Sequence, residues 1–472
     1  MRTHRPPDLT RRSNGLSHSN WLPLKLALAL KLPLILLQLA ARTRTPTRLS
    51  FPEKVQMNKR DFIRTTATTS LGMMFGPELL ARLASTPPIA LASDEPFWAE
   101  MRAKFKLTPD YINLENGYYC FQPQEVLEQF IGNVRAINVE ASHYMRTRQV
   151  DDDLHVRAQL AALAGCPVEE LIVTRNTTES LDTIIGGFDW KPGDEAVMAN
   201  QDYGAMLDMF RLQARRCGLR NIMVDVPMDP KSDDEVVQVY ANALTPKTRL
   251  LMIAHMVNIT GHILPVRAIC DMAHARGVHV MVDGAHAFAH LDYKIPDLHC
   301  DYYGASLHKW LAAPLGSGLL YVKKERIAGI WPMFADLSMP DDDIRKLNHK
   351  GTNPVHTGIT IPNSIAFHQV IGSARKEARL KWLQQYWTTK VRGLPKIVMN
   401  TPSDPKRTGA IANVGIQGIK PADLAKVLLD KYKIFTVAID GALVRGVRVT
   451  PQVYTASAEL DKFVAALREL AA

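Results

Sequence analysis

Asp283 and Lys309 are the two residues of this sequence whose types and spacing suggest covalent chemistry. Asp283 ends an apolar run at 278–283, and Lys309 follows the next apolar run, within Ser-Leu-His-Lys-Trp at 306–310. A lysine amine can form a Schiff base with an aldehyde, and a carboxylate can keep a pyridine nitrogen protonated so that the ring withdraws electrons. The pair therefore predicts that the chain uses pyridoxal 5'-phosphate.

A second motif has the properties of a phosphate site. Asn176-Thr177-Thr178 follows an apolar run at 171–174 and precedes a helical pattern. Backbone N–H groups at a helix N-terminus, with hydroxyl groups beside them, bind phosphate well. By itself Asn-Thr-Thr at a helix start is more often a simple cap. Its occurrence in a chain that also carries Asp283 and Lys309 favours the phosphate site.

These motifs resemble those of the class V aminotransferase-fold enzymes of the fold type I pyridoxal phosphate superfamily, in particular the isopenicillin N epimerase-like and cysteine desulfurase-like branch. The resemblance covers roughly residues 100–472. It implies that the cofactor phosphate lies at Thr177 and Thr178, with further contacts from Ser306 and His308. It also implies an α/β fold: a seven-stranded, mainly parallel sheet between helices, followed by a smaller C-terminal α+β domain.

The resemblance assigns further residues around the cofactor ring. Tyr203 falls where the family places a stacking ring, often a histidine, and Asp202 is the competing alignment. His286 matches the residue that contacts the cofactor 3-oxygen, and Asn258 matches the residue beside the same oxygen. The expected catalytic residues are Lys309, Asp283 and His286.

Gly351-Thr352 resembles the pair that reaches the cofactor phosphate from a neighbouring subunit. An active site completed in this way requires a homodimer. The alternative is that the two residues form a simple turn.

Arg448 falls where the family places the arginine that binds the substrate carboxylate, and Arg445 is the nearby competitor. A guanidinium pairs with a planar carboxylate through two parallel hydrogen bonds. Asn258 and Asn116 match further substrate contacts. The implied substrate is a small-molecule amino acid.

The five cysteines show no zinc-binding or redox spacing, which favours free thiols packed as small apolar residues. Cysteine desulfurases carry a catalytic cysteine on a loop before the carboxylate-binding arginine. Between Lys396 and Arg448 this chain has none, so a persulfide mechanism is not expected.

The resemblance therefore implies an enzyme that acts on an amino acid through an external aldimine, as an epimerase or an aminotransferase. A C–S or other β-lyase remains an alternative, because all three reactions share that intermediate and differ in later steps. A different class of function, a non-catalytic exported binding protein that kept the fold, is the second alternative.

The order of apolar and amphipathic runs predicts an α/β body that ends in a small α+β domain, and the resemblance implies that an N-terminal segment packs on that small domain. Runs that are apolar throughout are typical of strands buried on both faces. We expect an N-terminal segment at 93–125 that packs on the small domain, a large cofactor-binding domain at 126–360 and a small domain at 361–472. The predicted strands of the large domain are 171–174, 195–199, 221–226, 249–255, 278–283, 302–306 and 319–322.

The N-terminal region carries the basic excess of the chain. Residues 1–60 contain twelve of the 57 Lys and Arg but two of the 47 Asp and Glu, so the remainder carries 45 of each. The body therefore offers no bulk charge for nucleic acid or for a stable membrane partner.

Residues 1–92 are predicted to be a leader. Asn58–Arg64 resembles a twin-arginine export motif, and an apolar stretch and a small-x-small cleavage site at 90–92 follow it. This order predicts a signal at 57–92 and export to the periplasm, with 1–56 as a start-site artefact. The alternatives are an uncleaved basic leader and a cytoplasmic protein.

Overall fold

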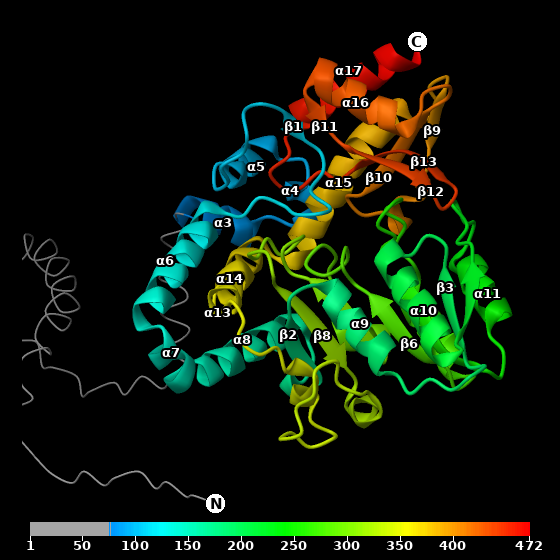
Figure 1. Ribbon diagram of the computed structural model, residues 1–472. Coiled ribbons are helices and arrows are strands. Elements are labelled where there is room, and N and C mark those ends of the chain that lie inside the picture. Colours follow the sequence, from blue (N-terminus) through cyan, green and yellow to red (C-terminus); the bar gives the residue numbers. More distant parts are fainter. Residues whose placement is uncertain (1–74, 76) are drawn as a thin grey trace, which may run out of the picture. The chain divides into compact units, whose positions relative to one another are not determined.

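The computed structural model describes Phe75 and residues 77–472 (Figure 1). The predicted start-site segment at 1–56 and the twin-arginine-like motif at 58–64 lie outside the described residues. Among the residues that are described, no helix is both long and apolar enough to cross a membrane.

A seven-stranded sheet forms the centre of the large domain, in the order β2-β8-β7-β6-β5-β3-β4. Neighbouring strands are parallel except around β8, which runs antiparallel to both β2 and β7. The sheet confirms the predicted fold class. Its strands are β2 (Leu171–Thr174), β3 (Glu195–Ala199), β4 (Arg220–Val224), β5 (Thr248–Ala254), β6 (His279–Asp283), β7 (Tyr302–Ser306) and β8 (Gly318–Val322).

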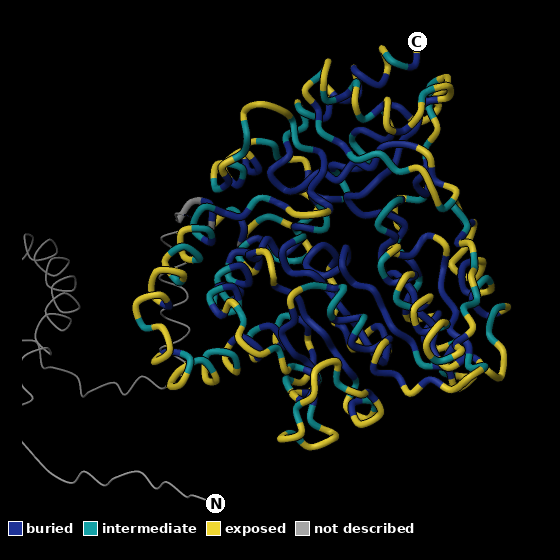
Figure 2. The backbone as a smooth tube through the Cα atoms, viewed as in Figure 1, coloured by how far each residue is buried: buried dark blue, intermediate teal, exposed yellow. Residues whose placement is uncertain are grey.

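Helices cover both faces of this sheet, so most of its strands are buried throughout (Figure 2). Side chains of successive strand residues point to opposite faces: in β6, Val280 and Val282 enter one core cluster and Met281 enters the other. The helices of the described chain are α3 (Pro77–Ser85), α4 (Pro88–Leu91), α5 (Glu95–Arg102), α6 (Gln124–Glu140), α7 (Ser142–Thr147), α8 (Gln149–Ala164), α9 (Thr177–Gly187), α10 (Gly204–Cys217), α11 (Asp233–Ala243), α12 (Val266–His274), α13 (Val355–Gly358), α14 (Ile361–Ile371), α15 (Ser373–Val391), α16 (Pro421–Tyr432) and α17 (Ser457–Ala471).

Local sequence explains where the helices around the site begin and end. Asn176 caps α9 by accepting the backbone N–H of Glu179. Gly218 ends α10 in the left-handed conformation, with φ of 73°, which favours glycine.

The small domain is built on an antiparallel sheet in the order β12-β13-β10-β9, which packs against α15, α16 and α17. A separate short strand, β1, comes from the N-terminal segment and pairs in parallel with β11. The strands are β1 (Ile112–Asn113), β9 (Ile397–Met399), β10 (Ala412–Ile416), β11 (Ile434–Phe435), β12 (Val437–Gly441) and β13 (Val444–Val449).

Two predicted elements differ in the structure. The sequence pattern over 361–386 predicts a long helical connection, which the structure divides into α14 and α15 at Gly372, whose φ is 83°. The apolar run at 434–439 predicts one strand, which the structure divides into β11 and β12 because its first residues pair with β1 and its last residues pair with β13. The first break depends on a backbone conformation and the second on strands that are distant in sequence, so the apolar pattern predicts neither.

The described end of the predicted leader is helical and contacts the body. Leu79, Leu83 and Leu91 are buried. Within the predicted cleavage site at 90–92, the carbonyl of Ala92 accepts a hydrogen bond from Arg379 Nη1 over 3.0 Å.

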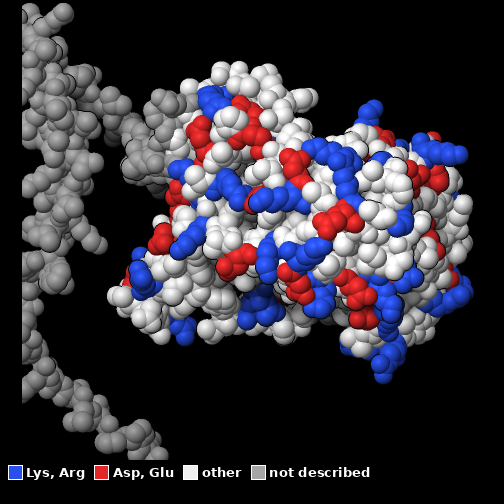
Figure 3. Space-filling view, turned by 90° about the horizontal axis from the view of Figure 1, so that it is seen from above, with Lys and Arg blue, Asp and Glu red and all other residues white. Residues whose placement is uncertain are grey.

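Charged side chains are dispersed over the surface of the body. Lys and Arg alternate with Asp and Glu over the face seen in Figure 3. This agrees with the balanced charge of the chain beyond residue 60.

Candidate active site

The fold brings Asp283 and Lys309 to one edge of the sheet. Asp283 ends β6, Lys309 follows β7, and the two strands are parallel neighbours in which Asp283 pairs with Gly304. Carboxyl ends of adjacent parallel strands meet at the same edge, where ligands of open α/β sheets bind. Gly284 is required here, because a Cβ at this position would lie 1.8 Å from the Tyr303 ring.

Asp283 is a buried carboxylate that lacks a cation. Its Oδ1 accepts the backbone N–H of Ala285 over 2.9 Å, and within the described residues it forms no salt bridge. Burial raises its pKa, while the Ala285 hydrogen bond and the charge of Lys309 act in the opposite direction. A protonated pyridine nitrogen would supply the missing positive charge.

Lys309 loses its proton more readily than an ordinary lysine. Burial lowers the pKa of its amine to about 8, with the charge of Asp283 acting in the opposite direction. Its Nζ lies 3.2 Å from Nε2 of His286. An amine of this kind is available as a nucleophile near neutral pH.

His286 is fixed on both sides of its ring. It is 3% exposed, and Trp310 Nε1–H donates to its Nδ1 over 3.3 Å. Burial and the nearby charges of Lys309 and Arg448 hold the pKa of His286 well below its usual range, so the ring is neutral.

Thr177 and Ser306 meet at the predicted phosphate site. The backbone N–H of Thr177 donates to Ser306 Oγ over 2.9 Å, and the two hydroxyls are 2.7 Å apart. The N-terminus of α9 thus faces the end of β7. The start of α9 also lies close to β8, because a Cβ on Gly318 of β8 would lie 2.7 Å from Asn176.

His308 contributes a buried polar atom that has no partner. Its Nδ1 forms no hydrogen bond with any described residue, and burial lowers its pKa to about 4. A bound ligand can satisfy such a buried polar atom. Together with the unpaired carboxylate of Asp283 and the N-terminus of α9, it fits pyridoxal phosphate.

The two alternative residues after β3 occupy different environments. Tyr203, the predicted stacking ring, is 46% exposed at the start of α10. Asp202 is buried, accepts the backbone N–H of Ala199 over 2.8 Å and lies near enough to Asp283 for its charge to matter. Burial, assisted by Asp283, raises the pKa of Asp202 to about 7.

Arg448 of β13 is paired with a residue that the sequence did not reveal. Its Nη2 donates to Glu115 Oε1 over 2.5 Å and its Nε donates to Glu115 Oε2 over 3.1 Å. The side chains are 9% and 3% exposed. The only local signal was a glutamate beside Asn116-Gly117, which by itself does not predict an ion pair.

Donor counting shows what Arg448 can still bind. A guanidinium has five N–H groups; two bind Glu115 and one, on Nη1, binds the backbone carbonyl of Asn258 over 3.3 Å. One N–H on each terminal nitrogen has no partner among the described residues. These two groups can donate to a carboxylate.

The two predicted asparagine contacts have different surroundings. The side chain of Asn116 is fully engaged, because its Nδ2 donates to the carbonyl of Thr450 over 2.7 Å and its Oδ1 accepts from Tyr454 Oη over 2.7 Å. It ties its loop to the segment that follows β13 and so helps to position Glu115. Asn258 approaches Arg448 with its backbone, as given above.

The side chains of Thr352 and Thr178 form no hydrogen bond with another described residue. Thr352 is exposed and follows Gly351, whose φ is 61°. Thr178 lies in the first turn of α9. The roles predicted for both residues stay predictions.

The Aminotransferase class-V family profile matches residues 121–459. The chain belongs to this family. It is accordingly a pyridoxal phosphate-dependent enzyme, and the matched region contains Asp283, Lys309 and Arg448.

Individual relatives differ in the reaction that they carry out. The chain is 29% identical over 394 residues to the isopenicillin N epimerase of Amycolatopsis lactamdurans, which covers 79% of this chain and 98% of the relative. It is 24% identical over 389 residues to a cysteine desulfurase of Haloferax volcanii, covering 76% and 89%. Its fold is similar to that of the cystine C–S lyase C-DES, with a TM-score of 0.70 and 20% identity, covering 76% and 98%.

Proposed function

We propose that the enzyme labilises the Cα–H bond of an amino acid and returns a proton to Cα, as an epimerase-like enzyme. The observation that carries this proposal is the juxtaposition of a buried Lys309 amine, whose pKa is lowered to about 8, with an arginine that keeps two N–H groups for a carboxylate. One group can carry the proton and the other can hold the substrate.

Thr177, Ser306 and His308 would hold the cofactor phosphate, and Asp283 would face the ring nitrogen. When bound, pyridoxal phosphate supplies an electrophilic aldehyde and an electron-withdrawing pyridinium ring. The protein supplies the fixed negative charge of Asp283, which favours the protonated form of that ring.

Lys309 is the proton carrier in this proposal. With a pKa of about 8, its amine is close to the solution pH, where a group serves well both as general base and as general acid. His286 Nε2, at 3.2 Å from Nζ, limits the positions that the amine can adopt.

Arg448 would orient the substrate through its α-carboxylate. Glu115 already balances the charge of the guanidinium, so the pair offers directed hydrogen bonds without a net positive charge. Orientation of this kind contributes to rate by holding the Cα–H bond near the base.

The cysteines support this assignment over persulfide chemistry. Cys120, Cys166, Cys270 and Cys300 are buried free thiols. Cys120 lies closest to the site, with Sγ 2.6 Å from the backbone carbonyl of Lys309, but burial raises its pKa to about 12. A thiol so far from ionisation is a poor nucleophile.

Incubation of the purified enzyme with individual amino acids in deuterated water tests the proposal. We expect deuterium at Cα together with loss of enantiomeric purity for the accepted substrates. Production of a 2-oxo acid without racemisation would contradict it in favour of an aminotransferase. Pyruvate, ammonia or sulfide release from substrates with a Cβ leaving group would contradict it in favour of a β-lyase.

We also propose that the enzyme is a homodimer in which Thr352 reaches the partner's site. Large apolar side chains are exposed along one segment: Trp331 is 66%, Phe334 is 50% and Leu337 is 96% exposed. Exposed apolar residues grouped in this way are typical of protein interfaces.

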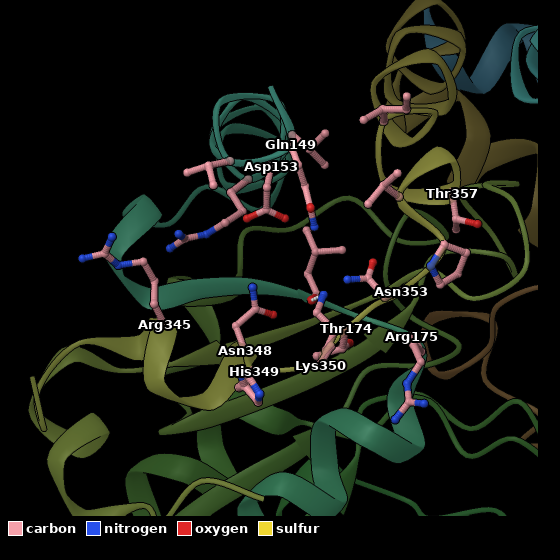
Figure 4. Close-up of a pocket in the computed structure, with 18 of the residues that line it drawn as sticks. Gln149, Asp153, Thr174, Arg175, Arg345, Asn348, His349, Lys350, Asn353 and Thr357 are labelled. Atoms are coloured by element: carbon pink, nitrogen blue, oxygen red, sulfur yellow. Dashed lines mark hydrogen bonds between the residues drawn. The ribbon is translucent and has the colours of Figure 1, made fainter. Parts of the chain in front are cut away.

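A cavity of about 350 Å³ adjoins this segment (Figure 4). Asp336 and Met339 line it, together with Lys350 and Gly351, next to Thr352. Arg175, which directly precedes the capping residue of α9, also lines it. The cavity is therefore lined both by the residues next to Thr352 and by a residue next to the predicted phosphate site, which supports its use as a contact surface for a second copy.

Sedimentation analysis of the wild-type chain and of Leu337→Asp tests the dimer. We expect a dimer that the substitution dissociates, with weaker cofactor retention in the monomer. Thr352→Ala should keep the dimer and lose cofactor affinity. A wild-type monomer that binds the cofactor fully would contradict the proposal.

Export through the signal predicted at 57–92 is a further proposal, supported by the order of its basic, apolar and small-residue segments. Cell fractionation with mass measurement of the mature chain tests it. A periplasmic chain that begins at residue 93 is expected, and an uncut chain in the cytoplasm would contradict it.

A further inference from the structure

Trp310 follows Lys309 in the chain and is fully buried. Its indole N–H donates to His286 Nδ1 over 3.3 Å, and His286 Nε2 lies 3.2 Å from Lys309 Nζ. The imidazole therefore stands between the indole and the reactive amine.

The hydrogen bond from Trp310 decides where the imidazole carries its proton. An indole nitrogen can only donate, so Nδ1 must offer a lone pair. The ring is neutral, because burial and the charges of Lys309 and Arg448 hold the pKa of His286 well below its usual range. A neutral imidazole has one N–H group, which is therefore on Nε2.

The proton on Nε2 has a consequence for the amine that it faces. An ammonium group has donors and no acceptor, whereas a neutral amine has a lone pair. Nε2–H can therefore bond to Lys309 when the amine is neutral and repels it when the amine is charged. This acts in the same direction as burial of the amine.

We propose that Trp310 is a positioning residue: by fixing the proton of His286 on Nε2 it favours the neutral, nucleophilic form of Lys309 over the charged form. The inference rests on the proposed function in taking Lys309 as the reactive amine.

A second histidine fixes the indole and the backbone of His286. The backbone N–H of Ala410 donates to His290 Nε2 over 2.9 Å, so the His290 proton is on Nδ1, which lies 2.9 Å from the carbonyl of His286. The His290 ring lies against the indole, with centroids 3.9 Å apart. Lys376 Nζ donates to the carbonyl of Trp310.

Several charged groups also act on Lys309 and must be kept constant in any test. Asp283 and Glu115 raise its pKa and Arg448 lowers it; His308 is its neighbour in the chain. The groups that act on His286 are Lys309, Arg448 and His290. Trp310→Phe removes the indole N–H and alters none of these charges.

Trace acetylation of the full-length, cofactor-free chain measures the free amine directly. Acetic anhydride is applied at a series of pH values, and the label on the Lys309 peptide is quantified by mass spectrometry. We expect Trp310→Phe to move the midpoint upward by about one pH unit, so that labelling well below both midpoints falls about tenfold.

Trp387→Phe is the matched control. Trp387 is also fully buried, but it packs on Phe463 in the small domain, and its indole nitrogen has no hydrogen-bond partner among the described residues. Its substitution should leave the Lys309 midpoint unchanged. Thermal unfolding shows that both variants are folded.

A double-mutant cycle separates the path through His286 from a general effect on the site. In the His286→Phe background, Trp310→Phe should add no further shift. A further shift there, or an unchanged midpoint in folded Trp310→Phe, would overturn the proposal.

Nitrogen-15 spectra of the labelled wild-type chain provide a test that needs no variant. The His286 ring should show a bare Nδ1 and a protonated Nε2, and the opposite tautomer would overturn the proposal. Acetylation and spectra report on the amine and the ring without turnover. Failure of the proposed function would appear separately, as absent Cα exchange with an intact labelling profile.

Discussion

Asp283 at the end of β6 and Glu115 in the loop after β1 are both buried carboxylates of the active site, but only Glu115 has an ion-pair partner within the described residues. Asp283 lies in the large domain, and a ligand would supply the positive charge that pairs with it. Glu115 already neutralises Arg448. The charge of Asp283 on the cofactor side is therefore not neutralised by the protein. The charge of Arg448 on the substrate side is already neutralised by Glu115 before a substrate binds.

Asp283 is therefore suited to bind a ligand through its charge, whereas Arg448 is suited to bind one through the direction of its hydrogen bonds. A buried unpaired charge is costly, and a ligand that supplies the opposite charge removes that cost. A buried ion pair with good geometry offers its remaining N–H groups as directed donors. We therefore expect charge changes at Asp283 and at Glu115 to have opposite effects on the stability of the cofactor-free protein.

Loss of Lys309 should have the largest effect. Lys309→Ala removes the only group that we place as proton carrier, and a reduction of about 10²- to 10⁴-fold in Cα–H exchange is expected. Borohydride should no longer fix the cofactor to this position. Lys346→Ala removes another buried lysine, whose Nζ points to the carbonyl of Ala328, and should retain both properties. Full exchange activity in Lys309→Ala would exclude the proposed role.

Glu115→Gln should destabilise the protein strongly. The substitution preserves volume but leaves the guanidinium of Arg448 buried without its counter-charge, which costs about 3–5 kcal/mol in the free energy of unfolding. Denaturant titration of the cofactor-free chain measures it. Asp430→Asn breaks the exposed pair with Lys426 and should leave the midpoint unchanged; an equally small effect of Glu115→Gln would remove the contrast between the two carboxylates.

Asp283→Asn should have the opposite sign. Because burial raises the folded-state pKa of Asp283, the carboxyl destabilises the fold above its unfolded-state pKa. The amide should therefore stabilise the cofactor-free chain at neutral pH by roughly 1 kcal/mol. The gain should disappear below about pH 4, where the acid is protonated in both states. Destabilisation at neutral pH would show that Asp283 has a partner before the cofactor binds.

The remaining prediction concerns the dependence of stability on pH that Lys309 contributes. Its folded-state pKa of about 8 lies below the ordinary value of 10.5, so between these values the unfolded chain binds more protons and stability rises with pH. The free energy of unfolding of the cofactor-free wild type minus that of Lys309→Met should rise across this window. Taking the difference cancels the tyrosine and cysteine titrations that both chains share. A flat difference would mean that the amine is charged in the folded protein.

Much of the large domain could be predicted from the sequence. The runs at 171–174, 195–199 and 302–306 coincide with β2, β3 and β7 residue for residue. These strands are buried on both faces, so their composition alone sets them apart from neighbouring segments. Asp283 and Lys309 could be found for the same reason, because each lies where such a run ends.

The other half of the site could not be predicted in this way. Glu115 and Arg448 are 333 residues apart, and neither stands in a local pattern that indicates its partner. In the sequence Trp310 is only an apolar neighbour of Lys309. Its indole hydrogen bond to His286 could not be predicted, because it depends on the conformation of the turn after β6. Tyr203 was the predicted stacking ring and Asp202 the competing alignment, and the sequence did not reveal that the first is exposed and the second buried.

By itself the sequence determined the identity and order of the reactive groups, because strand ends, helix caps and apolar runs are local features of the chain. The tertiary structure decided which charges are neutralised and where protons reside. Those properties depend on burial and on distances of about 3 Å between side chains from remote segments, and only the packed domains set them.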